Sequence, residues 1–188
     1  MLQTKYTVLN SLAEKGGTVI FGSKEDTLIP LCELKQSFGL GSNFYNRSFE
    51  ELSVTNAKEL YKSYIADLVP NTIFLHIGEN DLNIFQEDSN NFIKLYRELI
   101  GEIRSDNKKR RIIIVSLKNY DTNAIITKLN EQLKYLADSE RCEFADISEK
   151  KLWNPTGTRD AVSFAYSLGL KAQKPLYDLV KILFCYTC

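Results

Sequence analysis

The chain is predicted to fold as an α/β domain with a mainly parallel sheet, and three observations predict this. Apolar runs alternate with amphipathic segments of helical period along the 188 residues. Two of the runs, TIFLHI from Thr72 and RIIIVSL from Arg111, are almost continuously apolar, which is typical of strands buried on both faces. Short polar turns follow several of the runs, where open parallel sheets place their ligand sites.

Five strands follow from the apolar runs, each bounded by turn residues. They are expected near Thr18–Phe21, Asn43–Tyr45, Thr72–Ile77, Arg111–Leu117 and Cys142–Ile147. The segments between them carry apolar residues about one helical turn apart and are predicted to be helices. These are Thr4–Glu14, Thr27–Phe38, a segment from Ser53 or Thr55 to about Leu68, Glu87–Arg104, Asn123–Leu136 and most of Asp160–Cys188. Gly22 to Asp26 is expected to be a polar turn. No repeat or linker interrupts this pattern, so residues 1–188 are predicted to form one domain.

The composition is that of an ordinary globular protein. Hydrophobic residues make up 44% and charged residues 26%, and the formal net charge is zero. The balanced charge argues against a nucleic-acid partner bound through bulk charge. No apolar run is long enough to cross a membrane, and the N-terminus lacks the apolar region of a signal peptide, so we expect a cytoplasmic protein without membrane insertion.

The four cysteines do not predict a metal or redox site. Cys185 and Cys188 form a C-x-x-C at the C-terminus, but the chain offers no second ligand pair and only one histidine, His76. We therefore expect free thiols, no metal and no cofactor.

The most informative turn is Gly78-Glu79-Asn80-Asp81, directly after the Thr72 strand. Gly78 lets the backbone turn tightly, and an Asn side chain at this edge can donate a hydrogen bond to an oxygen that gains negative charge. The alternative is a polar strand-to-helix turn in which Asn80 or Asp81 caps the following helix.

Three turns and one later segment together resemble the motif blocks of the SGNH (GDSL-type) hydrolase superfamily. In order, they are Gly22-Ser23-Lys24, Asn46-Arg47-Ser48, Gly78-Glu79-Asn80-Asp81 and Asp160-Ala161-Val162-Ser163. The resemblance covers nearly the whole chain from Thr18. It implies a flavodoxin-like three-layer α/β/α sandwich with a five-stranded parallel sheet in the order 2-1-3-4-5. It also implies hydrolysis of carboxylic esters, with a small acyl ester or acylated sugar as substrate.

The family roles transfer to this chain unevenly. Gly78, Asn80 and Asp81 match the G-x-N-D block, in which the Asn is an oxyanion donor. Ser48 stands at the position of the second block's glycine, whose backbone N–H is another oxyanion donor. These four residues are the expected oxyanion-hole and ligand-binding set.

The nucleophile and base positions depart from the family pattern. Where the family has Gly-Asp-Ser, direct alignment puts Ser23 at the Asp and Lys24 at the nucleophile, whereas a shift of one residue makes Ser23 the nucleophile. In the fourth block Asp160 matches the family Asp, but Ser163 stands where the general base His should be. Ser23, Lys24, Asp160 and Ser163 are thus the expected, degenerate catalytic positions.

Neither remaining basic side chain restores a triad. Lys24 could form a Ser–Lys dyad with Ser163, but a salt bridge between Lys24 and Asp160 is the preferred interpretation, since Asp160 would keep the lysine protonated. His76 lies inside a strand, where an imidazole with a satisfied hydrogen bond is the expected role.

Three functions remain open at this point. The first is an ester hydrolase with weak or lost activity, and the second is a non-catalytic protein that binds an acyl or carbohydrate ligand in the former cleft. The third is a structural or interaction module that kept only the fold. The sequence does not indicate an oligomeric state.

Overall fold

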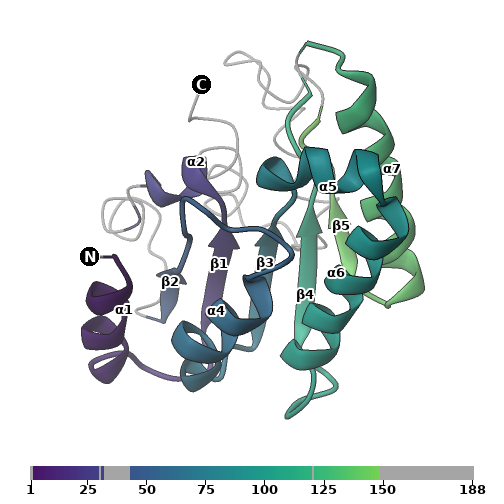
Figure 1. Cartoon of the computed structure of the whole chain (residues 1–188). Helices are drawn as coiled ribbons and strands as arrows, with labels where there is room; N and C mark the ends of the chain where they lie inside the picture. The colour runs from purple at the N-terminus through teal and green to yellow at the C-terminus, as the bar shows by residue number, and fades with distance from the viewer. Residues whose placement is uncertain (1, 30, 32–42, 120, 149–188) are drawn as a thin grey trace, which may run out of the picture.

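The computed structural model describes residues 2–29, 31, 43–119 and 121–148. Five parallel strands form one sheet in the order β2-β1-β3-β4-β5 (Figure 1). Their bounds are β1 Thr18–Gly22, β2 Phe44–Asn46, β3 Thr72–His76, β4 Arg111–Val115 and β5 Glu143–Ala145. The α/β class, the parallel sheet and the strand order are as predicted.

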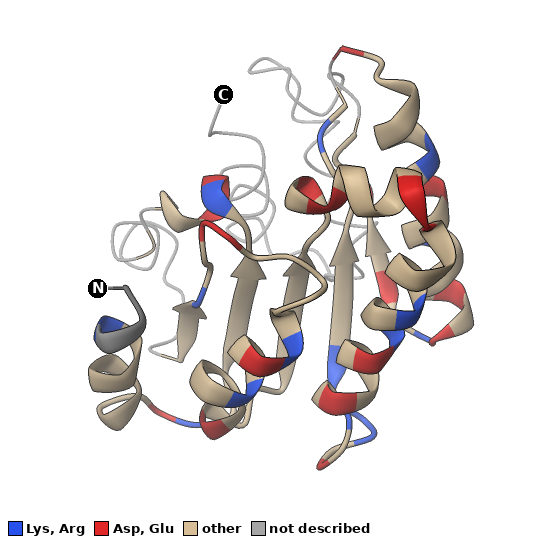
Figure 2. Cartoon of the chain, in the orientation of Figure 1, with Lys and Arg blue, Asp and Glu red and all other residues tan. Residues whose placement is uncertain are grey.

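Among the described residues, α1 precedes β1 in the chain and the other helices lie between the strands. These helices are α1 Leu2–Ser11, α2 Lys24–Thr27, α4 Ala57–Tyr64, α5 Leu82–Glu87, α6 Ser89–Ile103 and α7 Ala124–Ser139, with short 3-10 turns η1 at Ala66–Leu68 and η2 at Glu79–Asp81. Figure 1 shows α4 and α6 lying across the sheet and α1 beside its β2 edge. Charged residues gather on helices and loops, whereas the strands are almost free of them (Figure 2). No helix in the described ranges has the length and apolar character needed to span a bilayer.

The core forms where the predicted apolar faces meet the sheet. Phe92, Leu99 and Ile103 of α6 and the three leucines 129, 133 and 136 of α7 are buried together with the central residues of β1, β3 and β4. The periodicity that predicted these two helices therefore also identified the side chains that hold them to the sheet.

Several predicted boundaries were wrong, because capping and turn residues set the ends of the elements and the apolar pattern does not include them. The helix expected over Glu87–Arg104 begins at Ser89, because the Asp88 carboxylate caps α6 by accepting the Asn91 N–H over 3.0 Å, and the separate helix α5 precedes it. The helix expected from Ser53 begins at Ala57 and gives way to η1 after Ile65. The second strand lies one residue later than expected, and the last two strands are shorter.

The largest difference from the predicted elements is in the segment that follows β1. Lys24–Thr27 is helical, where a polar turn was predicted, and Leu28, which falls within the helix expected over Thr27–Phe38, is 73% exposed. Most of the remaining predicted helix to Phe38, and the expected helix from Asp160, lie outside the described residues.

Candidate functional site

The turns after β1 and β2 are joined at the carboxyl edge of the sheet. The Gly22 N–H donates to the Ser48 hydroxyl over 3.1 Å, and the Phe49 N–H donates to the Gly22 carbonyl over 3.0 Å. Gly22 also lies opposite His76 in the β1–β3 register. Three of the four motif segments therefore meet at one edge, as parallel strands require.

Ser23 is buried beneath Glu79. It precedes α2 and is 1% exposed, and its hydroxyl donates to the Glu79 Oε2 over 2.5 Å. Its backbone N–H donates to the Asp26 Oδ2 over 3.0 Å, which is half of a capping box. Both polar groups of Ser23 are thus held by carboxylates from its own turn and from the β3 turn.

His76 forms a buried pair with Asp26. The distance between His76 Nδ1 and Asp26 Oδ2 is 2.8 Å, and the same carboxylate oxygen accepts the Ser23 N–H. Burial lowers the pKa of His76, but the Asp26 charge and hydrogen bond raise it by more, so that the pKa lies above its ordinary value. The imidazole has the strand position and the hydrogen bond that the sequence predicted.

The Gly78–Asp81 turn holds the loop that follows β2. Gly78 has a φ of +135°. Residues with a side chain rarely adopt this backbone conformation, which explains glycine at this position. The Asn80 amide donates to the carbonyls of Glu50 and Leu52 over 3.0 and 2.9 Å. Asp81 accepts the Ser53 hydroxyl over 2.5 Å and the Val54 N–H over 3.2 Å, and burial raises the pKa of its carboxyl.

Both expected oxyanion donors are engaged within the protein. The Ser48 N–H donates to the Asn46 Oδ1 over 3.1 Å, and the Asn80 Nδ2 has the two carbonyl acceptors just described. An oxyanion in this region would have to displace these acceptors to gain the same hydrogen bonds.

The remaining catalytic positions are divided between the described and undescribed parts of the chain. Lys24 is the exposed first residue of α2. Asp160 and Ser163 lie outside the described residues, and with them the expected Lys24–Asp160 salt bridge. In the described ranges, the Ser23 hydroxyl donates to the Glu79 carboxylate, and the His76 imidazole pairs with Asp26.

Asp26 and Glu79 are functional candidates that sequence reasoning missed. Glu79 occupies the variable position of the G-x-N-D block, where no signal distinguishes it. Asp26 had a usable signal, because it follows Ser23 by three residues, the spacing of a capping box.

Cys142 is the one cysteine in the described part of the chain. Cys142 is half-buried, and burial raises the pKa of its thiol to about 11, which keeps it protonated and unreactive. The other three cysteines lie outside the described residues.

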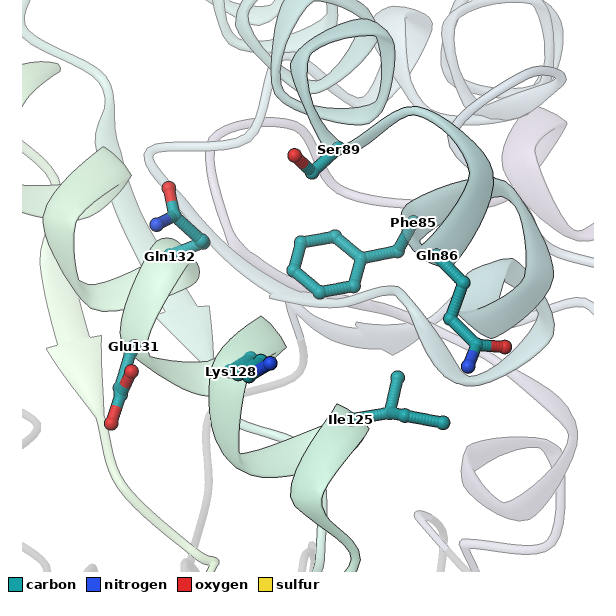
Figure 3. A pocket seen from close by; sticks show the side chains of 7 residues that line it. All are labelled: Phe85, Gln86, Ser89, Ile125, Lys128, Glu131 and Gln132. Atoms are coloured by element: carbon teal, nitrogen blue, oxygen red, sulfur yellow. The ribbon is translucent and has the colours of Figure 1, made fainter.

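A hollow of about 450 Å³ lies between α5 and α7, away from these turns (Figure 3). Its wall includes Phe85, Gln86, Ile125, Lys128 and Gln132, and the Phe85 ring faces its centre. None of the motif residues lines it.

Comparisons with known proteins support the fold. No protein-family model matches the chain, and no curated protein matches it in sequence. Among solved structures, one from Streptococcus pneumoniae described as a platelet activating factor superposes with a TM-score of 0.68 at 22% identity, covering 100% of this chain and 91% of the other.

Two further similar structures carry descriptions that name an activity. A GDSL-like lipase from Bacteroides thetaiotaomicron has a TM-score of 0.63 at 15% identity, with 96% of this chain and 94% of the other covered. An acetyl-xylooligosaccharide esterase from Geobacillus has a TM-score of 0.58 at 14% identity, with 93% and 94% covered. The fold of this chain is therefore that of the SGNH hydrolases.

Proposed function

We propose that this chain is an SGNH-type ester hydrolase in architecture whose ester hydrolysis is weak or lost. The observation that carries the proposal is the 2.5 Å hydrogen bond from the Ser23 hydroxyl to the Glu79 carboxylate, with Ser23 only 1% exposed. In the alignment that keeps a serine nucleophile, Ser23 is that nucleophile, and it has a carboxylate where it needs an imidazole.

Glu79 is a poor substitute for the missing base. In a Ser–His–Asp hydrolase an imidazole takes the proton of the nucleophile and later gives it to the leaving group, whereas here the Ser23 hydroxyl donates to a carboxylate. Ser23 is also enclosed, so a substrate carbonyl would have to displace Glu79 to reach its Oγ. Loss of triad members removes about six orders of magnitude in turnover, which accords with weak or absent activity.

The substrate class rests on the fold. The similar structures are described as a lipase and as an esterase of acetylated xylooligosaccharides. Small acyl esters and acylated sugars are therefore the compounds to test first.

A second candidate is ligand binding without turnover in the same cleft. Glu79 and Asn80 are exposed at the carboxyl edge of the sheet, and they could contact a polar ligand such as an acylated sugar. This function needs no activated nucleophile, so the missing base does not count against it.

A fluorophosphonate labelling assay with parallel turnover of p-nitrophenyl acetate and butyrate tests the proposal. We expect little labelling and turnover close to that of the Ser23→Ala variant. Rapid hydrolysis that is abolished by Ser23→Ala would overturn the proposal and would make Ser23 the nucleophile. Calorimetric titration with an acetylated xylooligosaccharide separates the two candidates, because saturable binding without product release favours the binding function.

A further inference from the structure

A second hollow lies on the outer flank of the sheet, between α1 and the edge strand β2. Its volume is about 420 Å³, within the range of small-molecule sites. Figure 1 shows α1 running beside β2, with α2 above them. Ser23, Glu79 and Asn80 do not line this hollow, whereas Asn46 and Arg47 of the second motif turn do.

Arg47 supplies a buried positive charge to this hollow. It is 4% exposed, and its guanidinium carbon lies 5.0 Å from the centre of the Tyr6 ring and 5.3 Å from that of Tyr45. The two rings hold the guanidinium by cation–π contacts, which fix its plane without neutralising it.

The hydrogen-bond partners of Arg47 are neutral. Its Nε donates to the Asn10 Oδ1 and its Nη1 to the Asn46 carbonyl, both over 2.8 Å. In the described part of the chain, no carboxylate lies within ion-pair distance of Arg47, and Nη2 has no acceptor. A buried cation without a counter-ion is costly, and burial accordingly lowers the pKa of Arg47.

The rest of the wall is largely apolar and open to solvent. Leu9, Leu12, Ala13 and Phe44 contribute to it, and Leu12 is 82% exposed. Exposed leucines beside a cavity favour an apolar occupant, since each would lose water-accessible surface on binding. Lys5 and Glu14 also line the hollow and are exposed, so its charged side chains are two cations and one carboxylate.

We propose that this hollow binds an aliphatic carboxylic acid, with the carboxylate on Arg47 and the hydrocarbon chain along Leu9, Leu12 and Phe44. The carboxylate would supply the counter-ion that Arg47 lacks through a charge-assisted hydrogen bond from Nη2. A carboxylate also matches the single buried positive charge better than a phosphate monoester, which carries nearly two negative charges.

Calorimetric titration with decanoate, below its micelle-forming concentration, tests the charge and the chain separately. We expect saturable binding of decanoate, about tenfold weaker binding of decanol, and negligible binding of acetate. Equal binding of decanoate and decanol would exclude a role for the charge, and no binding of decanoate would overturn the proposal.

Variants locate the site. Arg47→Met keeps the aliphatic stem but removes the charge, and it should weaken decanoate binding at least about tenfold. The matched control is Arg97→Met, because Arg97 is half-exposed and pairs with Glu140 in another part of the molecule. This control should bind decanoate like the parent.

Leu12→Gln is a second variant that tests the site even if Arg47→Met fails to fold. Leu12 is exposed, so the change should leave the fold intact and weaken decanoate binding severalfold. Unaltered decanoate binding in both Arg47→Met and Leu12→Gln would place the ligand elsewhere. None of these measurements involves ester turnover, so their outcome is independent of the proposed function.

Discussion

The Ser23 hydroxyl donates to the Glu79 carboxylate over 2.5 Å, across the gap between the turns that follow β1 and β3. Ser23 is buried whereas Glu79 is exposed, so the carboxylate covers the hydroxyl from the solvent side. The same contact links two segments that are 56 residues apart in the chain. It therefore both holds the turns together and removes Ser23 from reach of a substrate.

Removing Glu79 should destabilise the protein. In Glu79→Ala the buried Ser23 hydroxyl loses its acceptor, which should cost about 1–3 kcal/mol in the free energy of unfolding measured by urea denaturation. Glu51→Ala is the control, because the Glu51 side chain is exposed, and it should change stability by less than about 0.5 kcal/mol. Equal stability of the two variants would show that the hydrogen bond contributes nothing.

Restoring both missing family residues should create esterase activity. The double variant Lys24→Ser with Ser163→His would place a serine and a histidine at the family nucleophile and base positions, with Asp160 at the position that orients the base. We expect turnover of p-nitrophenyl acetate above that of the parent only in the double variant, because nucleophile and base act as a unit. Comparable gains in either single variant would contradict the alignment.

The His76–Asp26 pair should make stability depend on pH. Because the folded-state pKa of His76 is raised above 6.5, the protonated pair contributes stability that is fully present below about pH 6.5. That contribution is lost as the pH rises through the raised folded-state pKa. Urea midpoints measured from about pH 6 to pH 9 should fall in the parent and stay flatter in His76→Gln.

Gly22→Ala should disturb the same pair through a steric contact. A methyl group at position 22 would lie 1.8 Å from the Asp26 Oδ2, the oxygen that binds His76 and the Ser23 N–H. We expect a loss of about 1–3 kcal/mol in unfolding free energy and a weaker pH dependence. Gly101→Ala is the matched control: nothing lies within 4 Å of its new methyl group inside α6, so it should gain about 0.5–1 kcal/mol.

Arg110 should be the most sensitive position at the opposite edge of the sheet. Its guanidinium is buried and donates to the Tyr61 hydroxyl, to the carbonyls of Pro70 and Ile103, and to both carboxylate oxygens of Asp106. Arg110→Met leaves several buried acceptors unpaired and should cost about 3 kcal/mol or more by urea denaturation. Asp106→Asn should cost less than about 1 kcal/mol, because that side chain is half-exposed and can be hydrated.

The fold could be predicted from the sequence because its signals are local and repeated. The continuous apolar runs of β3 and β4 and the helical period of α6 and α7 predict buried strands and amphipathic helices without knowledge of any contact. The strand order came from the family resemblance, and the sheet confirms it.

The site could be predicted only in outline, because its chemistry depends on which side chains meet. The motif turns were located from sequence, but the acceptor of the Ser23 hydroxyl is Glu79, which lies in another turn. Asp26 was expected in a loop, yet it caps a short helix and holds His76 from the neighbouring strand.

Thus the sequence by itself determined the α/β class, the five strands and the absence of a family histidine at position 163. Only the tertiary structure decided that Ser23 is covered by Glu79 and that Arg47 is buried between two tyrosine rings without a carboxylate from the described residues. The physical reason is that strand and helix patterns depend on residues close together in the chain. The partner of a buried polar group, in contrast, can come from a distant segment that the sheet places beside it.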